Sequence, residues 1–194
     1  ACQAAIKAGI PQEVPAYGVT MICGSGMKSI INAVASIKAG DANLILAGGT
    51  ESMSGAGFVL PGSVRNGYKM GDISMVDHMV TDGLTDAFQG YHMGITAENI
   101  AAKYGITREE QDAFSFASQQ KAAAAIDAGR FKGEIVPVEI PSKKETIIFD
   151  TDEFVNRSTN LEKLGGLRPA FKKDGTVTAG NASGINDGAA ALVI

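Results

Sequence analysis

Apolar and polar positions near the start of the chain predict a helix between two short strands. Short apolar runs at Val19–Ile22 and Leu44–Ala47 are typical of strands. Between these runs, apolar side chains recur at helical spacing from Met27 to Ile37, and Gly40 marks the end of the helix. Two strands joined by a helix favour a right-handed crossover, so we expect a β-α-β unit with parallel strands.

Helical and strand patterns continue through the rest of the chain. A helix is expected from Thr96 to Tyr104, and Thr107 and Glu110 have the spacing of a capping box that opens a second helix over residues 108–128. Three further runs are typical of strands and occupy residues 135–141, 146–149 and 187–194. A polar loop is expected at 150–166, between the second and third of these runs.

The distribution of glycine and proline divides the chain into two predicted parts. Residues 1–54 and 180–194 carry the strand and helix patterns of one α/β domain. Residues 55–179 interrupt that domain with glycine-broken segments, two helices and short strands. The expected fold class is therefore α/β, with residues 55–179 inserted between the strands of the first domain.

Composition and charge limit the classes of function. The 194 residues are 45% hydrophobic and 20% charged with a net charge of −4, which is ordinary for a globular protein and does not favour nucleic-acid binding. No apolar run approaches the roughly 20 residues that span a membrane, so no membrane partner is expected. The two cysteines, Cys2 and Cys23, do not make a disulfide framework, which favours a reducing, cytoplasmic location. The chain starts without Met and stops inside an expected strand, so we expect an interior piece of a longer protein.

Cys23 is the candidate for chemistry that the residues themselves indicate. It stands where the first expected strand ends and a buried helix begins, and the N–H groups and partial positive charge of a helix start suit a nucleophilic thiol. Gly24 and Gly26 allow a substrate to approach the backbone closely. The alternative is that Cys23 is a small core residue, the commonest role of a free cysteine. The residues alone leave both interpretations open.

Four segments together give the sequence a resemblance to a known family. They are Cys23-Gly24-Ser25-Gly26, AGGTESMS at 47–54, YHMGITAEN at 91–99, and LRPAF at 167–171 with GTVTAGNASG at 175–184. In this order they resemble the thiolase family, and most closely its biosynthetic type. The resemblance covers essentially the whole chain. It implies a layered α-β-α fold with an inserted α+β loop domain that lies over the active site.

The resemblance also implies a reaction. Cys23 would take an acyl group from acetyl-CoA, and the carbanion of a second acetyl-CoA would attack that group, giving acetoacetyl-CoA and CoA in a reversible Claisen condensation. Coenzyme A would be substrate and product, with no other cofactor and no metal. The histidine and second cysteine that thiolases use as acid and base match nothing in this chain, so we expect the piece alone to be inactive. The positions that match the family's substrate contacts are His92, Met93, Leu167, Phe171, Ala179 and Ser183.

Charge and the resemblance together suggest further contacts. Arg157, Lys163 and Arg168 are candidate partners for the phosphates of coenzyme A. The segment at 54–91 resembles the family loop that pairs dimers, so we expect a homo-oligomer and favour a homotetramer.

Three alternatives to this function stay open: a longer-chain 3-ketoacyl-CoA thiolase, a condensing enzyme that uses acyl carrier protein, and a non-catalytic acyl-CoA-binding module.

Overall fold

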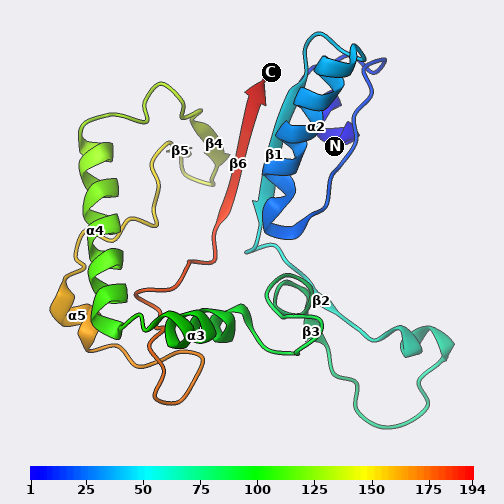
Figure 1. Cartoon of the computed structure of the whole chain (residues 1–194). Coiled ribbons are helices and arrows are strands. Elements are labelled where there is room, and N and C mark those ends of the chain that lie inside the picture. Colours follow the sequence, from blue (N-terminus) through cyan, green and yellow to red (C-terminus); the bar gives the residue numbers. More distant parts are fainter. The chain divides into compact units, whose positions relative to one another are not determined.

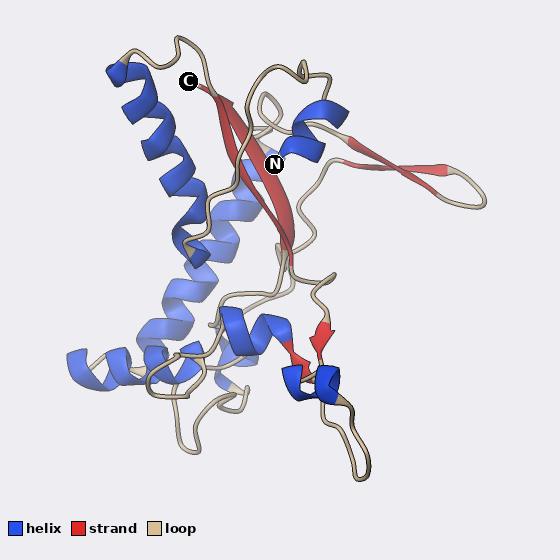
Figure 2. Ribbon diagram, turned by 90° about the vertical axis from the view of Figure 1, so that its right-hand side faces the viewer, coloured by secondary structure: helices blue, strands red, loops and turns tan.

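A computed structural model describes all of residues 1–194, and its mixture of helices and strands confirms the predicted α/β class (Figures 1 and 2). The α-helices are α1 (Cys2–Lys7), α2 (Ser25–Ala39), α3 (Met93–Tyr104), α4 (Arg108–Asp127) and α5 (Leu161–Gly165). The strands are β1 (Leu46–Ser52), β2 (Phe58–Val59), β3 (Val76–Asp77), β4 (Val138–Pro141), β5 (Thr146–Phe149) and β6 (Asp187–Val193). Shorter helical turns are η1 (Ile22–Gly24), η2 (Gly62–Asn66) and η3 (Met79–Gly83).

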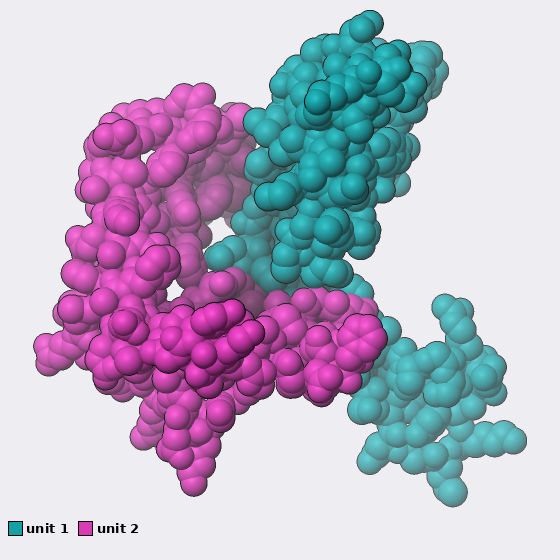
Figure 3. All heavy atoms as spheres, viewed as in Figure 1, with its two compact units in different colours: residues 1–79, 186–194 teal, residues 80–185 magenta.

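The chain forms two compact units, drawn in teal and magenta in Figure 3. Unit 1 consists of residues 1–79 and 186–194, and unit 2 consists of residues 80–185. The domain boundaries expected from the sequence, at 54/55 and 179/180, stay a prediction. None of the helices is both long and apolar enough to cross a membrane.

Unit 1 is built on an antiparallel pair of strands that are far apart in the sequence. Strand β1 pairs with β6 over their whole length, with Leu46 opposite Val193 and Ser52 opposite Asp187. The Ser54 hydroxyl and backbone N–H both donate to the Asp187 carboxylate beside the last pair, and these bonds lower the pKa of that carboxyl. The apolar run at 187–194 is therefore a strand, as predicted.

Helix α2 packs on β1 through very small residues. A Cβ at Gly49 would lie 3.4 Å from the Gly26 Cα, and the Ser29 hydroxyl donates to the Gly48 carbonyl at 3.0 Å. Ala33 of α2 and Ala47 of β1 are buried at this contact surface (3% and 6% exposed). Small side chains on both elements therefore bring the first turns of α2 close to the strand.

Three expectations for unit 1 are wrong. Val19–Ile22 is not a strand, since its first three residues have no regular structure and Ile22 begins η1. The parallel β-α-β unit is absent as well, because β1 pairs only with β6 and runs antiparallel to it. A strand requires a neighbour with free backbone groups, and the Met21 N–H is already bonded to the Ser25 hydroxyl. Helix α2 also buries only Ala33, so it is not the buried helix that its apolar pattern predicted.

The two long helices of unit 2 end within one residue of where the sequence predicted, and α4 begins at the predicted residue, whereas α3 begins at Met93, three residues before the expected Thr96. Helix α3 ends at Gly105, which has the left-handed φ of 67° that glycine adopts readily. The Thr107 hydroxyl accepts from the Glu110 N–H (3.2 Å), and the Glu110 carboxylate accepts from the Thr107 N–H (2.8 Å). This is the predicted capping box, and α4 follows it directly.

Two other segments of unit 2 differ from expectation in their limits. The strand expected at 135–141 begins only at Val138, and it forms a hairpin with β5, visible as a separate two-stranded ribbon in Figure 2. The expected polar loop at 150–166 contains α5, which begins where the Asn160 side chain accepts from the Lys163 N–H at 2.8 Å. The buried side chain of Leu164 (3% exposed) and the bonds from Arg108 of α4 to the Leu164 and Leu167 carbonyls attach this short helix to the unit.

The buried carboxylate of Glu98 fixes a loop of unit 2 against α3. Glu98 is 4% exposed, and its oxygens accept from the N–H groups of Thr176 and Val177 at 2.8–3.0 Å and from the Thr176 hydroxyl at 3.1 Å. Burial alone raises the pKa of this carboxyl, but these hydrogen bonds and the nearby charge of Lys172 outweigh it, so the pKa lies below its usual 4.5. A Cβ at Gly175 would overlap the carboxylate, so glycine is required for the loop to close this tightly.

A second polar cluster links the same loop to α4. The Asn181 side chain donates to Asp112 (2.9 Å) and to the Thr176 carbonyl (3.0 Å), and its oxygen accepts from the Thr178 N–H (2.7 Å). Asp112 is 5% exposed, and its other oxygen accepts from Arg108 Nε at 2.7 Å. Buried polar groups need such partners, so the loop has one fixed position on α3 and α4.

Phe171 packs directly over the start of α3. Its ring lies so close to the buried Gly94 that a Cβ on that residue would overlap the ring atoms. The ring is stacked on His92, with centroids 4.8 Å apart and planes 16° apart. Glycine at position 94 is therefore a steric requirement for this stack.

Replacing Glu98 tests the anchor of the loop. In Glu98→Gln one oxygen becomes an amide nitrogen that cannot accept, so a buried donor loses its partner, at a cost of about 2 kcal/mol. We expect the melting temperature to fall by roughly 4–8 °C, measured by calorimetry at pH 7. Because the folded-state pKa is below 4.5, the stability that Glu98 adds is complete above that pH and is lost as the pH falls through the folded-state value. The control is Glu153→Gln at an exposed carboxylate, and equal melting temperatures for the two variants would contradict the role of Glu98.

Adding one methyl group at position 94 tests the packing over α3. Gly94→Ala is expected to displace the Phe171 ring and to lower the free energy of unfolding by about 1–3 kcal/mol, the usual cost of overpacking. Denaturant titration gives this quantity, with Gly133→Ala as the matched control because nothing lies within 4 Å of a Cβ there. If both variants unfold at the wild-type midpoint, Phe171 does not sit on Gly94.

Candidate functional site

Cys23 lies in a short helical turn at the surface of unit 1. Its thiol is exposed, which rules out the core-residue interpretation for this structure. It is the middle residue of η1, and α2 starts two residues later at Ser25. The sequence therefore placed Cys23 correctly before a helix, although a turn and not a strand precedes it.

The turn that carries Cys23 has an unusual backbone. Ile22 has a φ of 47°, in the left-handed region that a β-branched residue normally avoids. The Ser25 hydroxyl makes a hydrogen bond on each side of Ile22. It accepts from the Met21 N–H at 2.8 Å and donates to the Ile22 carbonyl at 2.7 Å. Sequence reasoning did not single out Ser25, although a serine in the first turn of a helix commonly bonds to the backbone.

Some backbone N–H groups around Cys23 donate hydrogen bonds within the turn, and one does not. The Gly24 N–H donates to the Met21 carbonyl at 3.0 Å, and the Ser25 N–H donates to the Ile22 carbonyl. The Cys23 N–H is not among the hydrogen-bond donors of this turn. An exposed thiol beside an unoccupied N–H at a helix start can attack a carbonyl carbon and hold the oxyanion that forms.

Unit 2 contains the six residues expected to contact substrate, and it brings most of them together. His92 caps α3, where its Nδ1 accepts from the Gly94 N–H at 2.9 Å, and its ring stacks on Phe171. Nδ1 therefore carries no proton, and Nε2 is the donor that His92 can offer to a ligand. Met93 follows as the first residue of α3 and is 38% exposed.

The other expected contacts lie on two neighbouring stretches of loop. The Ala170 N–H donates to the Val177 carbonyl at 2.9 Å, so the 167–171 segment runs beside the 176–179 segment. Leu167 lies against Gly180, where a Cβ would overlap its side chain, and this brings Leu167 next to the exposed Ala179. Ser183 is exposed further along the same loop, and the structure shows no contact between it and the others.

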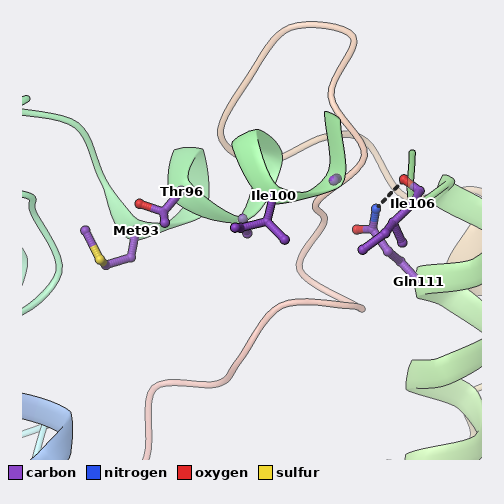
Figure 4. A pocket seen from close by; sticks show the side chains of 7 residues that line it. Met93, Thr96, Ile100, Ile106 and Gln111 are labelled. Carbon is purple, nitrogen blue, oxygen red and sulfur yellow. Dashed lines mark hydrogen bonds between the residues drawn. The ribbon is translucent and has the colours of Figure 1, made fainter. Parts of the chain in front are cut away.

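An apolar groove opens beside Met93 along α3. It has a volume of about 440 Å³, and Figure 4 shows Met93, Thr96 and Ile100 on one side of α3, with Ile106 and Gln111 beyond the end of the helix. The residues that line it are Met93, Thr96, Ala97, Ile100, Ala101, Ile106 and Gln111. Such a surface suits an aliphatic group and offers almost no polar contact.

Two of the three candidate phosphate contacts are engaged elsewhere. Arg157 forms a bidentate ion pair with Asp127, at 2.8 and 2.9 Å, and this bond raises the pKa of Arg157 and lowers that of Asp127. The Lys163 ammonium donates to the Ser158 carbonyl at 2.7 Å. Arg168 is exposed and makes no side-chain hydrogen bond, so it is the candidate still available to an anion.

Sequence reasoning also missed Glu98, the residue that fixes this loop. A signal was present, because Gly94, Glu98 and Ala101 share one face of α3 and all three are buried. A carboxylate on the buried face of a helix must have several donors as partners, and here these come from residues 78 and 79 positions later in the chain.

Comparison with known sequences gives the same family throughout. The family described as "Thiolase, N-terminal domain" matches residues 1–194. The acetyl-CoA acetyltransferase of Chromobacterium violaceum is 60% identical over 193 residues, covering 99% of this chain and 49% of the relative. The acetyl-CoA acetyltransferase of Pseudomonas aeruginosa is 58% identical over 193 residues, which also cover 99% of this chain and 49% of the relative. The chain thus spans about half the length of the curated relatives it matches.

Solved structures agree with the sequence comparison. Bacillus anthracis acetyl-CoA acetyltransferase superposes with a TM-score of 0.93 at 40% identity, over 99% of this chain and 48% of that one. Human mitochondrial 3-ketoacyl-CoA thiolase gives a TM-score of 0.93 at 45% identity, over 98% of this chain and 48% of that one. The predicted thiolase-like fold is thereby confirmed, and the chain belongs to the thiolase family, whose N-terminal domain it matches from its first residue to its last.

Proposed function

We propose that the protein containing this chain is an acyltransferase that condenses two molecules of acetyl-CoA to acetoacetyl-CoA and CoA. The observation that carries the proposal is the exposed Cys23 thiol beside an unoccupied N–H group before α2. Relatives 58–60% identical to this chain are named acetyl-CoA acetyltransferases, which supports the same substrate here. The activity is proposed for the whole protein, and we expect this chain alone not to complete turnover.

Acyl transfer to Cys23 is the first step of the proposed reaction. The sulfur attacks the thioester carbonyl of acetyl-CoA, a new carbon–sulfur bond forms, the bond to the CoA sulfur breaks, and CoA leaves with the proton of the Cys23 thiol. The Cys23 N–H donates to the oxyanion during this step. A second acetyl-CoA then loses a proton from its α-carbon to a base outside this chain, and the carbanion attacks the acetyl carbonyl. The carbon–sulfur bond to Cys23 breaks, and the thiolate that leaves takes back the proton from that base.

The loop cluster of unit 2 is the proposed binding surface for coenzyme A. His92, Met93, Leu167, Phe171, Ala179 and Ser183 would contact the pantetheine and acyl portions, with Nε2 of His92 and the Ser183 hydroxyl as hydrogen-bond donors. Arg168 is the proposed partner for a phosphate because Arg157 and Lys163 are already engaged. Coenzyme A is proposed as substrate and product, with no further cofactor.

A longer-chain 3-ketoacyl-CoA thiolase is the second candidate function. Two observations favour it: the likeness to human mitochondrial 3-ketoacyl-CoA thiolase, and the apolar groove that begins at Met93 and continues along α3. We still favour the short substrate, because the more similar relatives at 58–60% identity carry the acetyl-CoA acetyltransferase name.

The assembly and the compartment are part of the same proposal. A homotetramer is supported by the exposed apolar side chains between residues 54 and 91, which suit contacts between subunits. These include Phe58, Tyr68, Met70, Met75 and Phe88, of which Met70 and Phe88 are more than 90% exposed. The proposed cytoplasmic location rests instead on the two free cysteines.

Replacing the thiol tests the proposed nucleophile in the full-length protein. Cys23→Ser is expected to lower kcat for thiolysis of acetoacetyl-CoA by on the order of 10³-fold or more, because the covalent intermediate cannot form efficiently. Peptide mass spectrometry after incubation with acetyl-CoA should find an acetyl group on Cys23 in the wild type. Cys2→Ser is the matched control and should retain activity within about twofold, since Cys2 lies on α1 and bonds only to the Ala16 carbonyl. Full activity in Cys23→Ser would refute the assignment.

The acyl-chain length that the full-length protein prefers distinguishes the two candidate functions. We expect kcat/KM of the wild type to be higher for acetoacetyl-CoA than for 3-ketohexadecanoyl-CoA. Met93→Ala should raise the relative kcat/KM of the longer substrate by about tenfold, because it removes side-chain volume where the groove begins. Val136→Ala, at a residue that is 82% exposed and outside the groove, is the control. A wild type that prefers the longer substrate would favour the second candidate.

A further inference from the structure

We propose that Ser25 is a positioning residue for acyl transfer, which fixes the direction of the Cys23 thiol through a hydroxyl bridge across the preceding turn. This inference rests on the proposed function, in which Cys23 is the nucleophile, and it adds to that function a residue that touches neither substrate nor the reacting atoms.

The bridge uses both hydrogen-bonding capacities of one hydroxyl. Ser25 Oγ accepts from the Met21 N–H at 2.8 Å and donates to the Ile22 carbonyl at 2.7 Å. The Ser25 backbone N–H donates to the same carbonyl. Two donors from one residue thus converge on the carbonyl of the peptide that joins Ile22 to Cys23. The two hydroxyl bonds, at 2.7 and 2.8 Å, have the lengths of good hydrogen bonds.

This carbonyl belongs to the residue with the strained backbone. Ile22 has a φ of 47°, which an isoleucine adopts only when its surroundings impose it. Packing does not impose it here, because the Ile22 side chain is 58% exposed. The two bonds of the Ser25 hydroxyl, to the Met21 N–H and the Ile22 carbonyl, flank Ile22 and act together with the Gly24 N–H bond to hold this conformation.

The orientation of Cys23 depends on the same conformation. The peptide that carries the Ile22 carbonyl also carries the Cys23 N–H, so rotation at Ile22 turns both the thiol and the expected oxyanion donor. The bond from the Gly24 N–H to the Met21 carbonyl does not involve Ser25 and would persist without the hydroxyl. Loss of the hydroxyl would leave the two backbone bonds of the turn in place but remove both side-chain bonds beside Ile22, so we expect Ile22 to leave the left-handed region more often and redirect the thiol.

The reactivity of Cys23 relative to Cys2 is the test in the full-length protein. Both thiols are exposed, so peptide mass spectrometry of iodoacetamide-treated protein measures the Cys23 rate against an internal standard. Acetyl transfer from acetyl-CoA to Cys23 is followed in the same samples. Ser25→Ala is expected to slow acetyl transfer by about 10- to 100-fold, the range that follows from misplacing a reacting group by about 1 Å. The alkylation rate of Cys23 should change relative to that of Cys2, and Ser25→Thr, which keeps the hydroxyl, should restore both rates.

Two further variants separate positioning from loss of stability. Ser29→Ala also removes a hydroxyl from α2, one that donates to the Gly26 and Gly48 carbonyls. This variant should lower the melting temperature, but the ratio of the Cys23 and Cys2 alkylation rates should stay within about twofold of the wild type. Ile22→Asn introduces a residue that tolerates the left-handed region, so the effect of Ser25→Ala should be smaller in that background. A rate in Ser25→Ala within twofold of the wild type, or an unchanged effect of Ser25→Ala beside Ile22→Asn, overturns the inference.

The outcomes for the two proposals are distinct. If the wild type is not acetylated on Cys23, the proposed function fails, whereas the alkylation ratio still decides the role of Ser25. If Ser25→Ala does not fold, hydrogen exchange in the wild type decides it instead. The Met21 amide should then be protected at least tenfold more than the Thr20 amide, and equal exchange of the two would mean that the bridge does not exist.

Discussion

The buried carboxylate of Glu98 is the interaction on which the candidate binding surface depends. It lies on α3, the helix that His92 and Met93 begin, and it accepts hydrogen bonds from the loop that leads to Ala179 and Ser183. A carboxylate with 4% exposure is stable only when donors replace the lost water, so α3 and the loop must fold together. Residues that are far apart in the chain thereby become neighbours.

In unit 1, helix and strands pack closely because glycines, which have no side chain, stand at their contacts. Gly26 and Gly49 let α2 approach β1, and Gly48 lies where a Cβ would overlap the Ala190 carbonyl of β6. This close packing fixes the start of α2, next to the turn that carries Cys23. Around that turn, short hydrogen bonds from Ser25 act where apolar burial does not, because Met21, Ile22 and Cys23 are all exposed.

Local patterns predicted local structure well. The capping box at Thr107 and Glu110 and the glycine stop at Gly105 lie where expected, because each depends on bonds within a few residues. The strand expected at Val19–Ile22 failed for the opposite reason, since a strand needs a partner and a run of apolar residues cannot supply one. The helix α5 was missed because a single buried leucine, Leu164, makes too weak a pattern in a polar segment.

The sequence by itself determined the family, the position of Cys23 before a helix, the end of α3 and the start of α4. These are properties of short motifs, whose residues act on their own neighbours. Only the tertiary structure decided that β1 pairs antiparallel with β6, that Phe171 stacks on His92, and that Arg157 is held by Asp127. Each of these contacts joins residues at least 30 positions apart, and which distant groups meet depends on the packing of the whole unit, a property that no local pattern contains.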